Sequence, residues 1–244
     1  MLLRNSGFIL KRVLREITAL GILFITPIVL ITILGMISDG AVDEVMGIPR
    51  VDSVALSMIL AFQLFAGFYT LELINQDMIN KRKWKLLSLP IQFNRYMYSI
   101  ILVTTFYGGL QSYIITHYTR IVYGVTWGNQ LRLAISICII SLVVQLIYLN
   151  IALYLKNYKS MERAGTGLGL LSMGLGGVWF QIPDVPVLKV LTTYGNPYSL
   201  SKNILLDGMK NLTTFEGNVS IILLIVIGGL LVLASELKGR RIFR

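Results

Sequence analysis

The densest group of charged side chains lies in residues 80–87, NKRKWKLL, where four lysine and arginine residues flank Trp84. Such a group can pair with carboxylates while the indole is buried in a partner's pocket, which is the chemistry of docking onto another protein. The same residues can also rest on lipid headgroups, with the cations on phosphates. The segment therefore predicts either a protein-docking surface or a helix on the membrane surface.

Few residues suit catalysis or metal binding. His117 is the single histidine and Cys138 the single cysteine, which excludes a multi-histidine metal cage and an intrachain disulfide. The sequence contains neither H-E-x-x-H nor G-x-S-x-G, has no paired intramembrane aspartates, and lacks the phosphate-binding G-x-x-x-x-G-K-[ST] loop. We expect no catalytic residue, no metal site and no directly bound cofactor. Cys138 is expected to be a small buried residue of a membrane span.

The composition is that of a membrane protein. Of 244 residues, 55% are hydrophobic and 14% charged, and the mean hydropathy is +0.72, whereas a soluble domain carries about 25% charged residues. The formal net charge is +10. The cations are nevertheless confined to short segments and form no basic face of a soluble domain, so we expect no nucleic-acid partner. The sequence predicts an all-α polytopic membrane protein with one transmembrane domain over residues 1–244.

Six segments are long and apolar enough to cross a bilayer core about 30 Å thick, which requires roughly 20 helical residues. They cover about residues 17–37, 54–74, 98–118, 133–155, 164–182 and 219–237. Basic residues mark the cytoplasmic side of such spans. Sixteen of the 22 Lys and Arg residues fall on one side, in residues 4–15, 81–95, 156–163 and 238–244. The sequence therefore predicts that both termini are cytoplasmic.

The first apolar segment runs into an acidic loop and has no small-residue cleavage site after it, so we interpret it as an uncleaved span and not as a signal peptide. The absence of disulfide pairs and of organelle-targeting features fits a bacterial plasma membrane. Before this span, residues 2–16 place apolar side chains on one side of a helix and four cations on the other. This pattern predicts an amphipathic helix in the membrane interface. A plain basic flank to the first span is the alternative.

Two further connections have helical patterns. Residues 76–88 predict a short helix that is broken before Pro90. Between the fifth and sixth spans, about Val187–Thr193 and Tyr198–Met209 predict two short helices on the outer side. Asn196 is placed to cap the second of them. Neither outer helix is long enough to span the bilayer, so both are expected at or within its outer leaflet.

A stripe of small residues marks the fifth span. Gly165, Gly169, Ser172 and Gly176 are spaced by four, three and four residues and therefore share one helix face. Small side chains in this pattern allow close approach of another helix, which is the favoured interpretation. A hinge that moves during transport is the alternative.

Polar residues within the spans are candidates for function, because ionisable groups are costly in a membrane. Glu72 lies near the cytoplasmic end of the second span, where it can snorkel or contact the interfacial helix. Uncharged and weakly charged residues within or near the spans are expected to form interhelical hydrogen bonds more often than to bind substrate. They are Gln63, Gln111, His117, Gln145 and Asn150.

These features together resemble the permease subunit of a type 2 ABC exporter. The order of elements is similar over the whole chain: an interfacial helix, six spans with both ends inside, a helix between spans two and three, a Gly-rich fifth span and two short outer helices. KLLSLPIQFNRYMYSIIL resembles the family's LL-x-x-P segment, and GLGGVWFQIPDVPVLKVLTTYGNPYSLSKNIL resembles its GG…P…LP…L…NP region. One departure is that NKRKWK stands where the family often has an acidic, Gly-containing turn.

The resemblance implies a dimer of permease chains, identical or related, that works with two cytoplasmic ATPase subunits. ATP and Mg would be bound by the ATPase, and the helix of residues 76–88 would be a coupling helix that inserts into it. The implied ATPase-coupling residues are Asn80, Lys81, Arg82, Lys83, Trp84, Lys85, Leu86 and Leu87. Glu72 would be a possible gate residue. The expected function is outward movement of a drug-like, amphipathic or peptide substrate.

Two other functions remain as alternatives. A secondary carrier would need carboxylates near the middle of the membrane, and Glu72 alone comes near that position. A non-transporting immunity or sensor module could instead sequester a peptide. Association with an ATPase would distinguish the exporter from such a module.

Overall fold

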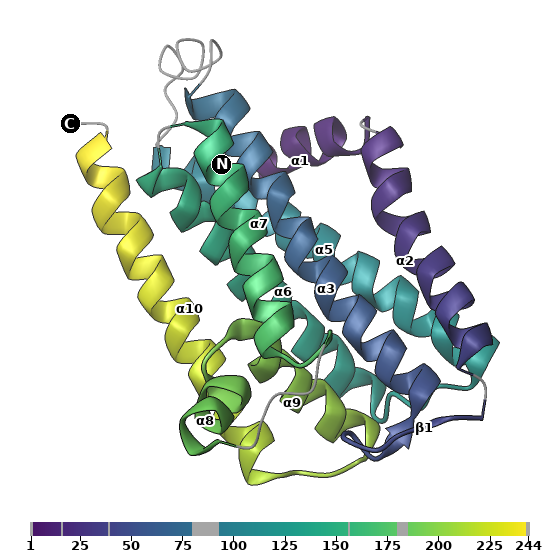
Figure 1. Ribbon diagram of the computed structural model, residues 1–244. Coiled ribbons are helices and arrows are strands. Elements are labelled where there is room, and N and C mark those ends of the chain that lie inside the picture. Colours follow the sequence, from purple (N-terminus) through teal and green to yellow (C-terminus); the bar gives the residue numbers. More distant parts are fainter. Residues whose placement is uncertain are drawn as a thin grey trace.

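The computed structural model describes residues 2–15, 17–38, 40–79, 93–155, 157–179 and 185–242, and these residues are almost entirely helical (Figure 1). The helices in chain order are α1 (Leu2–Val13), α2 (Ile17–Ile37), α3 (Arg50–Ile74), the π-helix η1 (Asn75–Ile79), α5 (Phe93–Tyr123), α6 (Gln130–Tyr154), α7 (Tyr158–Leu175), α8 (Pro186–Tyr194), α9 (Pro197–Met209) and α10 (Phe215–Ile242).

Four helical segments are long and apolar enough to cross a membrane: Arg50–Asp77, Asn94–Tyr123, Gln130–Tyr154 and Phe215–Gly239. These helices confirm the prediction of a helical membrane protein. A shorter apolar segment, Gly21–Ile37, belongs to α2. Both α2 and α7 pack against α3, and α2 also contacts α5 while α7 also contacts α6 (Figure 1).

The long helices run back and forth between two ends of one bundle. In the order α2, α3, α5, α6, α7 and α10, each runs opposite to the one before it (Figure 1). As a result, α1 and the last turns of α10 lie at the same end, here called the termini end. The other end carries α8, α9 and a small hairpin, and is called the hairpin end.

The hairpin between α2 and α3 was not predicted. Its strands β1 (Val42–Asp43) and β2 (Ile48–Pro49) are antiparallel, with Val42 opposite Pro49. Oδ1 of Asp43 accepts hydrogen bonds from the backbone N–H groups of Val45 and Met46, at 3.1 and 3.0 Å. This carboxylate therefore stabilises the turn between the strands.

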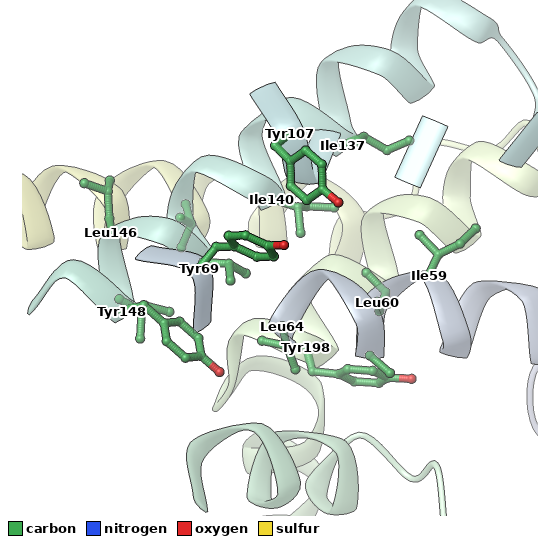
Figure 2. Close-up of a cluster of buried hydrophobic side chains, with 14 of the residues drawn as sticks. Ile59, Leu60, Leu64, Tyr69, Tyr107, Ile137, Ile140, Leu146, Tyr148 and Tyr198 are labelled. Carbon is green, nitrogen blue, oxygen red and sulfur yellow. The ribbon is translucent and has the colours of Figure 1, made fainter. Parts of the chain in front are cut away.

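The core is built around α3, which packs against α2, α5, α6, α7 and α9. Leu60 and Leu64 of α3 lie in one buried cluster with Tyr107 of α5 and Ile140 of α6 (Figure 2). In the most apolar stretch of 18 residues, 72% of the stretch is buried for Arg50–Asp77, whereas 17% is buried for Phe215–Gly239 of α10. The apolar side chains that α10 leaves exposed, such as Leu230 and Leu233, suit contact with lipid.

Hydrogen bonds join the long helices inside the bundle. Because lipid tails are as apolar as leucine, close packing and interhelical hydrogen bonds stabilise such bundles more than the hydrophobic effect does. Four of the five predicted polar contacts between helices are confirmed. The bonds run from Gln63 Nε2 to Ile137 O at 3.1 Å, from Gln111 Nε2 to Leu23 O at 2.8 Å, from Thr70 Oγ1 to Gln145 Oε1 at 2.6 Å, and from Asn150 Nδ2 to Leu231 O at 3.0 Å.

Two residue predictions are wrong. Nδ1 of His117 lies 3.2 Å from the carbonyl oxygen of Tyr113, which is one turn earlier in the same helix, so this contact is not interhelical. Cys138 is exposed, because it lies on a side of α6 that the other described helices leave uncovered.

The helix expected to be the fifth span is displaced along the chain. The predicted span covers residues 164–182, whereas α7 covers Tyr158–Leu175. It begins early because the side chain of Asn157 accepts a hydrogen bond from the N–H of Lys159, as a helix cap. It ends early because Gly177 adopts φ +75°, which helical residues do not.

Candidate functional site

A group of polar side chains connects four elements at the termini end. The polar cluster consists of Arg12 of α1, Glu72 of α3, Gln76 and Asp77 of η1, and Tyr96 of α5. Nη1 of Arg12 lies 2.7 and 2.8 Å from the two carboxylate oxygens of Asp77. The hydroxyl of Tyr96 donates to Oδ2 of Asp77 at 2.7 Å. A single carboxylate thus holds together the N-terminal helix and the helices on both sides of residues 80–92.

Gln76 extends the cluster to the predicted gate residue. Nη2 of Arg12 donates to Oε1 of Gln76, and Nε2 of Gln76 donates to Oε1 of Glu72 at 2.8 Å. Glu72 and Gln76 are four residues apart, so their side chains lie one above the other on the same helix face. Gln76 thus links Glu72 to Arg12 of the N-terminal helix.

The ion pair is largely removed from solvent. The side chain of Asp77 is 4% exposed and that of Arg12 is 25% exposed. A buried carboxylate is costly unless it is paired and hydrogen-bonded, and Asp77 has both kinds of partner. Movement of α1, η1 or α5 alone would therefore separate the Asp77 carboxylate from a partner, so the cluster favours movement of the three together.

The apolar side of α1 supports the ion pair by packing on the bundle. Ile9 and Val13 are buried, at 4% and 2% exposure, and α1 packs against α5. Phe8 and Leu14 are exposed and remain available to lipid. Part of the face that the sequence assigned to the membrane interface thus contacts protein.

Tyr158, the first residue of α7, lies close to the polar cluster. The carboxylates of Glu162 and Glu72 lie close enough to the Tyr158 phenol to interact with it electrostatically. A phenol is protonated at neutral pH and can donate a hydrogen bond. Glu72 lies between the N-terminal helix on one side and α7 on the other.

The predicted ATPase-coupling residues, Asn80 to Leu87, lie outside the described residues, as does most of the predicted helix of residues 76–88. The chain leaves the described part at Ile79, at the end of η1, and returns at Phe93, at the start of α5. Both flanking elements belong to the polar cluster. Residues 80–92 thus follow Asp77 and precede Tyr96 closely in the chain.

The stripe of small residues on α7 faces different neighbours along its length. A β-carbon on Gly165 would lie 2.9 Å from Cε1 of Tyr148, and one on Gly176 would overlap the ring of Tyr198. Ser172 is buried. Gly169 is also buried, but a β-carbon there would meet no atom within 4 Å. Close approach therefore occurs at the two ends of the stripe.

The sequence pointed to Glu72 but missed the residues that connect it. Gln76 had a signal, because it stands one helical turn after Glu72. No sequence signal beyond polarity marked the other three residues, Arg12, Asp77 and Tyr96. Their contacts join segments that are 19 to 65 residues apart in the chain. Among the described residues, no group of three or more His, Cys, Asp or Glu side chains is placed to hold a metal ion.

No family model matches this chain, and no curated protein matches it either. The function has to be inferred from the residues and their contacts.

Proposed function

We propose that this chain is the membrane-spanning permease subunit of an ATP-driven type 2 ABC exporter. It would cross a bacterial plasma membrane six times, with α2 and α7 joining the four long spans and both termini cytoplasmic. A second permease chain and two ATPase subunits that bind ATP and Mg would complete the transporter. Its substrate would be a drug-like, amphipathic or peptide molecule moved outward.

The observation that carries this proposal is the polar cluster next to residues 80–87. A docking segment can drive transport only if its displacement reaches the spans. In the chain, η1 precedes this segment and α5 follows it. The Asp77 carboxylate of η1 accepts hydrogen bonds from Tyr96 of α5 at 2.7 Å and from Arg12 of α1 at 2.7 Å, so both flanking helices are joined to α1. Displacement of the segment would thus be transmitted to the second and third spans and the N-terminal helix together.

The energy for the movement would come from differential binding. ATP-bound ATPases must bind one arrangement of the permease more tightly than the other, because a ligand shifts a conformational equilibrium only by its difference in affinity. Lys81, Arg82, Lys83 and Lys85 would pair with carboxylates of the ATPase, and Trp84 would be the buried anchor. In this mechanism Glu72 would gate the permease by exchanging partners between Gln76 and α7.

The experiment is reconstitution in lipid vesicles with the ATPase encoded by an adjacent reading frame. Trp84→Ala is expected to weaken ATPase association or to separate ATP hydrolysis from transport. Lys83→Glu should weaken association by reversing a docking charge, whereas Lys189→Glu, on α8 at the hairpin end, should leave it unchanged. If the chain binds no ATPase, or if Trp84→Ala changes neither complex stability nor transport, the exporter function is wrong and peptide sequestration becomes the better hypothesis.

A further inference from the structure

A cavity of about 750 Å³ opens at the hairpin end, far from the polar cluster. Its walls come from the β1–β2 hairpin, the start of α3 at Arg50, the end of α7, α8, α9 and the start of α10. Pockets for small ligands have volumes of about 300–1,000 Å³, so the cavity is large enough to bind one. The residues that decide its chemistry are Asp43, Glu44, Trp179, Lys202, Asn203 and Glu216.

Lys202 is a half-buried cation that lines this cavity. Its Nζ donates a hydrogen bond to the carbonyl oxygen of Gly176 at 3.0 Å. An ammonium group has three N–H donors, and this is the one hydrogen bond that Nζ makes within the part of the chain that the structure describes. Among the described residues, Lys202 therefore has two N–H donors without an acceptor, and these can serve a ligand in the cavity.

Asp43 does not complete the coordination of Lys202. Its carboxylate accepts hydrogen bonds from Ser53 Oγ at 2.7 Å and from two backbone N–H groups of its own turn. Burial lowers the pKa of Lys202, and the charge of Asp43 opposes this effect without cancelling it. An additional anion beside Lys202 would restore the stabilisation that burial removes.

The rest of the lining offers a second cation, the exposed Arg50, together with carboxylates and an apolar surface. The carboxylates of Glu44 and Glu216 lie at exposed positions of the lining and suit a cation. The large apolar side chains Val42, Val45 and Trp179 are 64%, 70% and 54% exposed around the same cavity. Anion-binding, cation-binding and apolar groups are thus present together.

We propose that this cavity binds the zwitterionic end of an amphipathic molecule. The ligand's anionic group would pair with Lys202, its ammonium group would face Glu44 and Glu216, and its apolar part would lie on Trp179 and the hairpin valines. A peptide with free termini and a phosphatidylethanolamine lipid both carry this chemistry. The site requires no ATP and no partner protein, so it stands independently of the exporter function.

The test is isothermal titration calorimetry on the full chain in maltoside micelles. The probes are trileucine, trileucine amide, N-acetyltrileucine and dihexanoylphosphatidylethanolamine. At least one zwitterionic probe should bind, and removing its anionic or cationic group should weaken binding about tenfold, as expected for loss of a charge-assisted hydrogen bond. Tighter binding of trileucine than of the lipid would indicate a peptide ligand, and the reverse would indicate a lipid.

Lys202→Met keeps the volume of the side chain and removes a partly buried charge, so the variant should fold. It is expected to weaken binding of the zwitterionic probe about tenfold. Lys210→Met, at an exposed lysine of the same end outside the cavity, should bind like the natural protein. Absence of binding by both zwitterionic probes, equal binding of trileucine and its amide, or equal affinity in Lys202→Met and Lys210→Met would overturn the proposal.

Discussion

The ring of Tyr148 occupies the place where a β-carbon on Gly67 would stand. Gly67 lies in α3 and Tyr148 in α6, and the Tyr148 hydroxyl donates to the carbonyl oxygen of Gly165 in α7 at 3.3 Å. The fully buried ring therefore joins three helices, in the cluster drawn in Figure 2. Its fit depends on the missing side chain of Gly67.

Gly67→Ala should destabilise the bundle by about 1–3 kcal/mol, because overpacking forces the ring or the helices to shift. Thermal unfolding in detergent micelles measures the effect. Gly167→Ala is the matched control, since a β-carbon there meets no atom within 4 Å, and it should stabilise α7 by about 0.5–1 kcal/mol. An unchanged melting temperature for Gly67→Ala would show that α3 and α6 are not held at this distance.

The contact between Arg12 and Asp77 can be tested by a double-mutant cycle. Arg12→Met and Asp77→Asn should each reduce the free energy of unfolding by about 1–3 kcal/mol, because each leaves a charged or polar partner without its hydrogen bonds. The double variant should lose less than the sum of the two. Lys11→Met, at the exposed neighbouring position, should have little effect. Additive losses would contradict the pairing.

The contribution of Asp43 to the stability of the hairpin should decrease in acid. Burial by itself would raise the pKa of Asp43, but hydrogen bonds from Ser53, Met46 and Val45, together with the charge of Lys202, outweigh it and hold the pKa below its ordinary value of 3.8. A lowered pKa contributes stability that is present above the unfolded value and lost as the pH falls through the folded value. The stability difference between the natural protein and Asp43→Asn should therefore be constant near pH 7 and shrink below about pH 3.8. Melting curves from pH 7 to pH 3 would detect this, and an unchanged difference would count against it.

The two ends and the middle of the small-residue stripe should respond differently to alanine. Gly176→Ala should lower the melting temperature, because the new methyl group would overlap the ring of Tyr198, whereas Gly169→Ala should maintain or raise it. Similar losses at both positions would indicate that another chain covers the middle of the stripe in the assembled protein.

Composition and hydropathy were enough to predict a helical membrane protein, because spans of about 20 apolar residues leave a strong signal. The boundaries of α7 were not predicted from hydropathy, since its first turns carry Lys159, Glu162 and Arg163. Asn157 and Gly177, which start and stop this helix, are cap signals that a hydropathy window does not record. Asn196 was predicted to cap α9, and its side chain does accept a hydrogen bond from the N–H of Ser199 at 2.9 Å.

The residues that bring the candidate sites together could not be predicted. Arg12 and Asp77 are 65 residues apart in the chain, and nothing in either segment specifies the other as its partner. Lys202 and Asp43 meet at the cavity only because α9 and the hairpin lie at the same end of the bundle. Periodicity shows which face of a helix is apolar, but it does not show which helix will cover that face.

The placement of α1 and the end of α10 at one end of the bundle has a practical consequence (Figure 1). Two copies of this chain can be encoded as a tandem fusion, in which a short flexible linker joins the C-terminus of the first copy to the N-terminus of the second. Under the proposed topology, with both termini cytoplasmic, no additional hydrophobic segment would be needed to return the polypeptide across the bilayer. A variant could then be introduced into one copy at a time, so that the contribution of each half of the proposed dimer is measured separately.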